Sequence, residues 1–260
     1  MKRIDIWSSG GGTQSAAIAA LICMGELSPD ISIISDTERE CEKTWNYHEN
    51  IIVPALESAG HIIHRIKKSD YATVDIYRGD KLLIPAFTDE SGDIGKLPTF
   101  CSTEWKKRVV QRFATTQFPE KTQFNMWIGY STDELKRVYQ ELGKWQPRYP
   151  LIEKRISRGD CYRLVEKMGW PPPPRSRCWM CPNQTHADWM ELHKEHERAK
   201  QSGKNYPTDW EKAVEFEKEI RAKDDAVYLH RSGKPLSEVK PEDDIGDLFT
   251  GRCDSGMCFV

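Results

Sequence analysis

The stretch WSSGGGTQSAAIAAL, Trp7–Leu21, places three consecutive glycines between a predicted strand and a predicted helix. Arg3–Trp7 has strand character, and Gln14–Met24 is rich in alanine and isoleucine, which favours a helix. Glycine adopts backbone angles that other residues avoid and allows close approach to the backbone. A helix N-terminus also presents N–H groups at the positive end of the helix dipole. The turn therefore predicts an anion site, and phosphate is the anion that such sites most often bind.

Hydroxyl groups surround this glycine turn. Ser8, Ser9, Thr13 and Ser15 can donate hydrogen bonds to phosphate oxygens beside the backbone N–H groups. The spacing differs from the P-loop pattern G-x-x-x-x-G-K-S/T, because no lysine follows the turn, and Ser15 occupies the place of the third glycine of G-x-G-x-x-G. A glycine turn between a strand and a helix also occurs where only tight packing requires it, so a structural role stays open.

The composition narrows the class of protein. The chain has 260 residues, 38% of them hydrophobic and 30% charged, which suits a hydrated globular protein of one or two domains. A formal net charge of −2 argues against a generally basic nucleic-acid binder, although a local basic patch is compatible with it. No apolar run approaches the roughly 20 residues that span a bilayer, and the start lacks a signal-peptide pattern. We therefore expect a cytoplasmic protein with no membrane partner.

Strands and helices alternate through the first half of the chain. Such alternation predicts a doubly wound parallel sheet, Rossmann-like, with helices on both faces. Beyond Arg3–Trp7, the predicted strands are Ile31–Ser35, His61–Ile66 and Phe124–Ser131, and the predicted helices beyond the first are Glu42–Ala59 and Thr103–Phe118. Because ligands of such sheets bind at the carboxyl ends of the strands, the glycine turn, Asp36 and Gly129 should converge there.

The pattern changes after Pro150. Ser157 is a predicted N-cap with Asp160 three residues later, as in a capping box. Four prolines, Pro171–Pro174, then precede a cysteine pair, and a charged stretch to Asp225 predicts solvated helix. We therefore predict a nucleotide-binding α/β domain over residues 1–150 and a distal, cysteine-bearing helical region over residues 151–260.

Several segments resemble one protein superfamily. GGGTQS, residues 10–15, resembles the pyrophosphate loop of the adenine-nucleotide α-hydrolases (PP-loop ATP pyrophosphatases, of the HUP fold), whose commoner form is SGGxDS. SDTERECEKTW, CSTEWKKR and GYSTDELKR resemble, in this order, segments of the phosphoadenosine phosphosulfate (PAPS) reductase-like branch. The part from YPLIEKR to CWMCP is similar to the distal region of that branch in phage and bacterial genomes. The resemblance spans nearly the whole chain.

The resemblance implies a site for ATP or a related adenylyl nucleotide. Asp36 would meet adenosine hydroxyls or a metal, and Mg²⁺ would neutralise the leaving pyrophosphate. Ser15, Lys106 and Asp133 would act in catalysis. Asp133 and Glu134 could equally cap the helix that follows them. The nucleotide-binding residues implied are Ser8, Ser9, Gly10, Gly11, Gly12, Thr13, Gln14, Ser15, Asp36 and Gly129.

Eight cysteines invite a separate hypothesis. Cys178 and Cys181 form a C-x-x-C pair, whose thiolates can bind one metal or cluster; a redox dithiol and two buried structural cysteines are the alternatives. In the resembling reductases an upstream cysteine helps bind a [4Fe-4S] cluster, which favours Cys101. Cys253, or Cys258 in its place, would be the fourth ligand, and zinc remains an alternative to the cluster.

The remaining cysteines and the histidines are predicted to be structural. Cys23 lies on the apolar face of the first predicted helix, and Cys161 follows a helix N-terminus, so packing is favoured for both. Cys41 lies near the expected nucleotide site, but its acidic neighbours Glu38, Glu40 and Glu42 would lower its reactivity. None of the seven histidines is paired at a spacing typical of a metal or catalytic site.

The predicted reaction is ATP-dependent adenylation at the α-phosphorus with release of pyrophosphate, serving sulfur transfer or modification of a nucleic acid or nucleotide. The acceptor stays open among tRNA, DNA and a small molecule, and a homodimer is compatible with the sequence. One alternative is reduction of PAPS, or of adenosine phosphosulfate, to sulfite by a C-terminal cysteine. Another is a non-catalytic, zinc-stabilised nucleotide-binding module.

Overall fold

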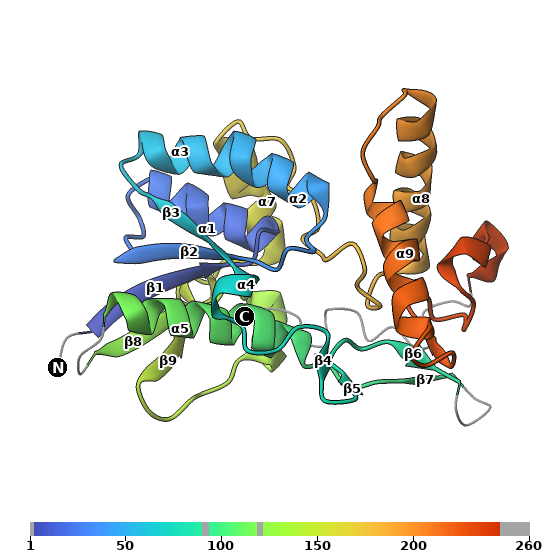
Figure 1. The fold of residues 1–260 in the computed structure, drawn as a ribbon. Coiled ribbons are helices and arrows are strands. Elements are labelled where there is room, and N and C mark those ends of the chain that lie inside the picture. The colour runs from blue at the N-terminus through green and yellow to red at the C-terminus, as the bar shows by residue number, and fades with distance from the viewer. Residues whose placement is uncertain (1–2, 90–93, 119–121, 245–260) are drawn as a thin grey trace. The chain divides into compact units, whose positions relative to one another are not determined.

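The computed structural model describes residues 3–89, 94–118 and 122–244. They form two compact units (Figure 1), the first from residues 3–73 and 102–176 and the second from residues 74–101 and 177–244. This division differs from the expected one at residue 150. Helix α7 (Arg158–Lys167) packs against α1 (Thr13–Cys23) within the first unit, while residues 74–101 associate with the C-terminal part of the chain.

The first unit is built on a five-stranded parallel sheet. Its strand order is β3-β2-β1-β8-β9, which confirms the doubly wound, Rossmann-like α/β fold. The direction in which strands are added reverses between the adjacent strands β1 and β8. The connections that follow these two strands therefore run to opposite faces of the sheet, which creates a topological switch point at their carboxyl ends. The strands are β1 (Arg3–Ser9), β2 (Ile31–Asp36), β3 (Ile63–Lys67), β8 (Gln123–Trp127) and β9 (Trp145–Arg148).

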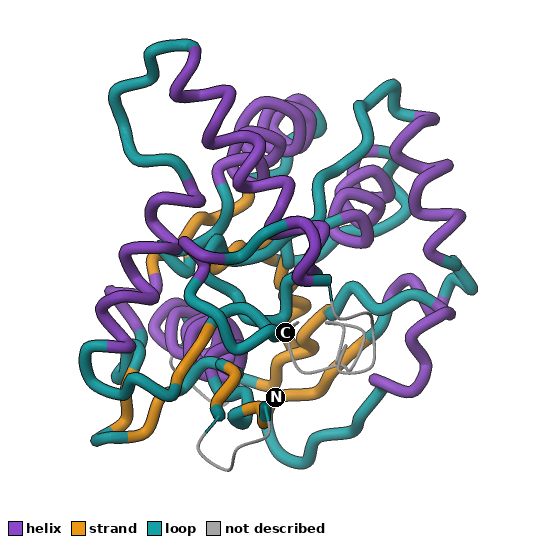
Figure 2. Tube along the Cα trace, turned by 90° about the vertical axis from the view of Figure 1, so that its right-hand side faces the viewer, coloured by secondary structure: helices purple, strands orange, loops and turns teal. Residues whose placement is uncertain are grey.

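Helices cover both faces of this sheet, with α1 and α3 on one face and α5 on the other (Figure 1). Figure 2 shows the same elements along the Cα trace, with strands in orange. The predicted helix 42–59 is continuous but contains a π-helical turn, and so does the helix predicted from residue 103. The elements are α2 (Glu42–Tyr47), η1 (His48–Ile52), α3 (Val53–Ser58), α4 (Lys68–Tyr71), η2 (Thr103–Lys107), α5 (Arg108–Gln117), η3 (Thr132–Arg137) and α6 (Pro150–Glu153).

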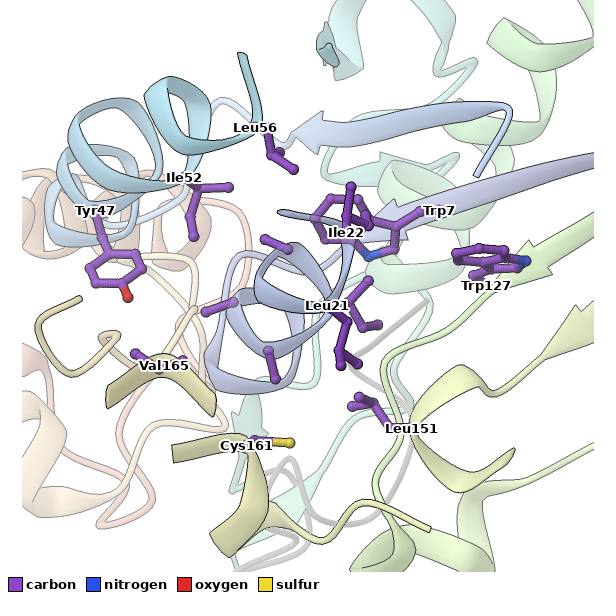
Figure 3. Close-up of a cluster of buried hydrophobic side chains, with 14 residues drawn as sticks. Trp7, Leu21, Ile22, Tyr47, Ile52, Leu56, Trp127, Leu151, Cys161 and Val165 are labelled. Atoms are coloured by element: carbon purple, nitrogen blue, oxygen red, sulfur yellow. The ribbon is translucent and has the colours of Figure 1, made fainter. Parts of the chain in front are cut away.

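One core surrounds α1 (Figure 3). Residues 16–22 of this helix are each at most 3% exposed, because small alanines allow close approach while Ile18, Leu21 and Ile22 fill the space around them. Trp7 and Trp127 meet it from the sheet, and Cys161 of α7 packs in the same cluster. Cys23 is partly buried against this core. The structural role predicted for these two cysteines is confirmed.

The opposite face of the sheet packs against α5. Ile4 and Ile6 of β1 meet Val109 and Val110 of α5. Trp7, adjacent to Ile6, lies in the α1 core, as the alternation of side chains along a strand requires. Phe124 stacks on Trp145 with ring centroids 4.2 Å apart, which fastens the edge strand β9 to β8.

The second unit combines short strands with two helices. The helices α8 (His186–Gln201) and α9 (Asp209–Arg221) each begin with a capping box. Trp189 and Trp210 are buried in them, so the charged stretch that predicted a solvated helix has an apolar face. The strands are β4 (Tyr77–Arg78), β5 (Lys81–Leu82), β6 (Phe87–Thr88), β7 (Gly95–Lys96) and β10 (Val227–Tyr228), and the 3₁₀ turns are η4 (Leu236–Glu238) and η5 (Pro241–Asp243).

Among the strands of the first unit, β9 and β8 depart most from the prediction. Strand β9 escaped notice because Pro147 interrupts its pattern, and proline is tolerated in a strand only where the missing N–H is not needed, as at a sheet edge. Strand β8 ends at Trp127, four residues before the predicted end. Among residues 3–89, 94–118 and 122–244, no helix has the length and apolar character needed to cross a bilayer.

The α1 core yields a test of the fold. Leu56 is fully buried in it, whereas Leu142 is 98% exposed. Leu56→Ala should lower the free energy of unfolding by about 2–5 kcal/mol because it leaves a cavity, and Leu142→Ala should change it by less than about 0.5 kcal/mol. Urea denaturation followed by tryptophan fluorescence measures both. Equal losses in the two variants would contradict this packing.

Candidate functional site

The glycine turn connects β1 to α1 at the switch point of the sheet. Gly11 has a φ of +75°, a conformation that other residues rarely adopt. A Cβ atom on Gly11 would lie 3.0 Å from Cγ2 of Thr44, whereas one on Gly12 would lie 3.6 Å from Cβ of Ser176. Gly11 is therefore required both by backbone angle and by space, and Gly12 by neither.

Hydroxyl groups hold the turn open. Ser15 Oγ accepts a hydrogen bond from the Gly10 N–H at 2.8 Å, and Ser9 Oγ accepts one from the Gly11 N–H at 3.3 Å. A hydroxyl that accepts a hydrogen bond can still donate its own proton. The hydroxyls of Ser9 and Ser15 can therefore both donate to an anion. For the Gly11 N–H to bind that anion as well, it would have to give up its hydrogen bond to Ser9 Oγ.

The N-terminus of α1 faces the same turn. Its first intrahelical bond runs from the Ala16 N–H to the Gly12 carbonyl at 2.9 Å, so the N–H groups of residues 13–15 precede the helical ladder. The first turn of α1 contains no acidic residue, and no carboxylate there opposes the positive end of the helix dipole. Ser8 and Thr13 are each 5% exposed, so both side chains are buried.

The corner after β8 lies beside α1. A Cβ atom on Gly129 would lie 3.5 Å from Cβ of Gln14. Gln14 Nε2 donates to Glu134 Oε2 at 3.0 Å, and Glu134 also forms a capping box with Ser131 at the start of η3. The structure thus brings Gly129 and Gln14 together, as predicted from the strand ends, and Glu134 fixes the orientation of the Gln14 amide.

Asp133 has a different neighbourhood. Its Oδ2 accepts hydrogen bonds from the Arg158 N–H at 2.5 Å and from Ser131 Oγ at 3.3 Å. Arg158 is the first residue of α7. Of the two roles left open for Asp133, helix capping therefore has support in the structure, although the capped helix is α7 and not the one that follows directly.

Asp36 ends β2 and is 4% exposed. Its Oδ2 accepts from Arg65 Nε at 2.9 Å and from Arg65 Nη2 at 2.7 Å. The Arg65 guanidinium lies 3.6 Å from the ring centroid of Trp45 and also pairs with Glu49. The sequence did not predict that Arg65 and Trp45 belong to this site. No short-range sequence pattern indicates that a residue of β3 pairs with a residue of β2.

Lys106 is linked to the turn through two residues that the sequence did not single out. Its ammonium lies 3.6 Å from Glu40 Oε2, and Glu40 Oε1 accepts from Ser176 Oγ at 2.5 Å. Ser176 packs beside Gly11 and Gly12. Between Asp36 and Glu40, the backbone at Glu38 has a φ of +60°. That residue is held by its carboxylate, which accepts from the Ser69 N–H and hydroxyl at 3.0 Å.

A small cavity lies behind the turn. Gly11, Gly12 and Ser15 line it together with Tyr47 and His48, and its volume of about 10 Å³ suits no more than a water molecule. Burial and the charge of Arg65 lower the pKa of His48 to about 4, so this imidazole is neutral at pH 7.

The candidate metal ligands fall in the second unit or outside the described residues. The Cys181 N–H donates to the Cys178 carbonyl at 3.1 Å, so the C-x-x-C forms a tight turn. Cys101 is partly buried. Within the part of the chain that the structure describes, no three Cys, His, Asp or Glu side chains gather as metal ligands. Cys253 and Cys258 lie outside that part.

Two buried histidines of the second unit, which are 44 residues apart in the sequence, lie within hydrogen-bonding distance of each other. His186 Nδ1 lies 3.1 Å from His230 Nε2, and burial together with the charge on His186 lowers the pKa of His230 to about 4. The spacing along the chain did not predict this pair, because it forms between the start of α8 and the loop after β10.

Comparison with known proteins finds only a distant structural similarity. No protein-family model matches the chain, and no curated protein matches it. Among solved structures it is similar to the U34-tRNA thiolase NcsA from Methanococcus maripaludis with its [4Fe-4S] cluster, at 13% identity and a TM-score of 0.41 over 85% of this chain and 72% of that one. A function for this chain therefore rests on its own residues.

The turn can be tested without a ligand. Gly11→Ala should destabilise the protein by about 1–2 kcal/mol from the left-handed backbone alone, and more from the contact with Thr44. Gly12→Ala is the matched control, because its new methyl group meets only an ordinary contact. Thr44→Ser removes Cγ2, so Gly11→Ala should cost less in a Thr44→Ser background. Thermal unfolding of the wild type, the three single variants and the Gly11→Ala, Thr44→Ser double variant measures this, and equal costs at positions 11 and 12 would refute the geometry.

Proposed function

We propose that this protein is a PP-loop ATP pyrophosphatase that adenylates an acceptor. The observation that carries the proposal is the turn from Ser9 to Thr13, which opens at the switch point of a doubly wound sheet and ends in a helix without acidic residues in its first turn. A polyphosphate there meets backbone N–H groups, the helix dipole and serine hydroxyls at once. The resemblance of GGGTQS to the pyrophosphate loop supports the same assignment.

The chemistry follows from where these groups lie. In the proposed reaction an acceptor nucleophile attacks the α-phosphorus, a new bond to phosphorus forms, and the bond to the bridging oxygen breaks to release pyrophosphate. Ser15 and the first N–H groups of α1 stabilise the negative charge that develops on the phosphate oxygens. Lys106 supplies a further positive charge. Asp36 binds an adenosine hydroxyl only if its ion pair with Arg65 yields.

A metal is not assigned to any step. Asp36 and Asp133 both accept hydrogen bonds from protein groups, and the described residues alone assemble no metal site. We propose that Cys178 and Cys181 bind a [4Fe-4S] cluster or zinc with Cys101 and Cys253, or Cys258 in its place. A cluster would serve sulfur transfer, for which tRNA is the acceptor we favour over DNA or a small molecule.

The reaction is tested by release of pyrophosphate. We expect ATP to yield pyrophosphate and an adenylated product when bulk tRNA is supplied, and Gly11→Val to abolish both release and ATP binding. Leu142→Ala, at an exposed position outside the turn, is the folded control. Calorimetry with ATP and a coupled pyrophosphate assay give the two readouts. Binding without turnover on tRNA, DNA and nucleosides would instead favour a non-catalytic nucleotide-binding module.

The metal proposal has its own test. Cys178→Ser with Cys181→Ser should remove iron or zinc from protein purified without oxygen, because two thiolate ligands are lost. Cys23→Ser is the matched control, since Cys23 packs against the α1 core. Elemental analysis and the visible spectrum measure both. An unchanged metal content in the double variant would leave the C-x-x-C a structural turn.

A further inference from the structure

A larger cavity lies near the end of α1 that is remote from the glycine turn. Its volume is about 470 Å³, and Leu21 of α1 lines it together with residues of α7. Thr13 begins α1 and Leu21 follows eight residues later, so roughly 12 Å separates them along a helix that rises about 1.5 Å per residue. This cavity, the α7 groove, is therefore distinct from the proposed phosphate site.

Basic side chains dominate the lining of the α7 groove. Four cations and two carboxylates line it, namely Lys154, Arg155, Arg163 and Lys167 with Glu26 and Asp160. The sequence has the same bias, since residues 154–167 include five basic and two acidic residues. The first unit thus contains a local basic patch, with which a net charge of −2 for the whole chain is compatible.

Both carboxylates of the lining are engaged by protein groups. Lys154 Nζ lies 3.1 Å from Glu26 Oε2, and Arg163 pairs with Asp160. Asp160 Oδ2 also accepts hydrogen bonds from the Ser157 N–H at 2.9 Å and from the Ser157 hydroxyl at 2.5 Å. The two carboxylates therefore offset two of the four cations.

The charges of the other two cations are not offset in this way. Arg155 and Lys167 are exposed, and neither forms an ion pair with a residue that the structure describes. Lys167 is the last residue of α7, where a cation interacts favourably with the helix dipole. That explanation does not extend to Arg155, which lies in the loop between α6 and α7.

The backbone of Arg155 has a φ of +58°. Its N–H donates to the Ile152 carbonyl at 2.9 Å, and the Ile156 N–H donates to the Leu151 carbonyl at 2.7 Å. This is the Schellman pattern of a helix end, in which the left-handed residue is usually glycine. An arginine costs stability there, and its side chain forms no ion pair within the described chain in return. Strain of this kind is typical of sites where the side chain has a function.

The chemistry of the groove suits a polymer of phosphates better than a single small anion. Sites for a small phosphate surround it with backbone N–H groups at a helix N-terminus or a tight turn. Here the cations are long side chains on the loop after α6 and on α7, and that of Arg163 is 70% exposed. Lysine and arginine side chains presented in this way bind the phosphodiester backbone of nucleic acids.

We propose that the α7 groove is a docking surface for the phosphodiester backbone of RNA, in which Arg155 and Lys167 contact phosphates. The inference rests on the proposed function in one respect, namely that tRNA is the favoured acceptor. Because the groove lies at the other end of α1, the phosphates it contacts are not those of the reacting nucleotide. Phosphate contacts carry no sequence information, so the groove contributes affinity and orientation, and the choice of nucleotide is made elsewhere.

The experiment measures binding of fluorescently labelled bulk tRNA to the full chain by anisotropy, without ATP, between about 50 and 200 mM salt. Lys167→Ala and Arg155→Gly should each weaken binding about threefold, the scale of one exposed charge contact. Each should also reduce the slope of log affinity against log salt by about 0.7–0.9, because one phosphate contact is lost. Arg155→Lys, which keeps the charge, should bind with the salt slope of the wild type.

Two controls separate a lost contact from a damaged fold. Lys194→Ala removes an exposed lysine of α8 that also has no ion-pair partner among the described residues, and it should leave affinity and salt slope unchanged. Arg155→Gly relieves the left-handed strain, so its thermal unfolding midpoint should rise by roughly 2–4 °C while its affinity for tRNA falls. A structural role for Arg155 predicts no loss of binding in a more stable protein.

Competitors identify the ligand. Inorganic tripolyphosphate should displace tRNA only at far higher concentration, since it cannot follow the groove. Duplex DNA should compete less well than unlabelled tRNA. Displacement by tripolyphosphate at an equal concentration of phosphate would indicate a small-anion site, and stronger competition by DNA would indicate a DNA-binding surface; either result would overturn the assignment to RNA.

The outcomes also distinguish this inference from the proposed function. Unchanged tRNA binding in Lys167→Ala and Arg155→Gly, or an equal loss in Lys194→Ala, overturns the docking surface and leaves release of pyrophosphate untouched. A wild type that binds no tRNA overturns the docking surface as well. Groove-dependent tRNA binding by a protein that releases no pyrophosphate would overturn the proposed adenylation alone.

Discussion

Helix α1 is enclosed by protein along almost its whole length. Sheet residues such as Trp7, the α3 residue Leu56 and the α7 residue Cys161 contact it from different sides. A helix so enclosed cannot slide or turn, because each shift would open voids or force overlaps in a closely packed interior. The position of its first residue, Thr13, relative to the sheet is therefore fixed. The glycine turn, the hydroxyls and the corner at Gly129 all take their positions from that constraint.

Charge is distributed at this edge of the sheet in matched pairs. Arg65 is opposed by Asp36, Lys106 by Glu40, and Arg137 by Glu134. In each pair the cation compensates a carboxylate that is at most 15% exposed, and a carboxylate so buried would be costly to leave unpaired.

Local features of the site could be predicted from sequence, and distant ones could not. The strand, the three glycines and the alanine-rich helix are contiguous, so β1, the turn and α1 were predicted within two residues. Ser157 and Asp160 form the predicted capping box for the same reason. Glu40 and Ser176 are separated by 136 positions, and only the folded chain brings them together.

The sequence pattern also did not predict how the chain divides into two units. Residues 74–101 join the second unit, yet their strands are two residues long, too short to give a periodic signal. In α8 and α9, tryptophans among many charges form the buried face, and composition alone favoured a solvated stretch. The assignment of Cys253 and Cys258 stays a prediction.

The antiparallel pairing of β6 with β10 has a consequence for synthesis of the chain. Phe87 pairs with Tyr228, so the segment that contains Phe87 leaves the ribosome long before its partner is made. At about 5–20 residues per second, the delay is roughly 10–30 s. During that interval the first unit can complete its sheet, whereas β6 can pair only with β7 and lacks its second neighbour, β10. The nascent protein therefore passes through a stage in which an apolar insertion emerges from an otherwise finished domain, and this stage is where chaperone binding would matter most.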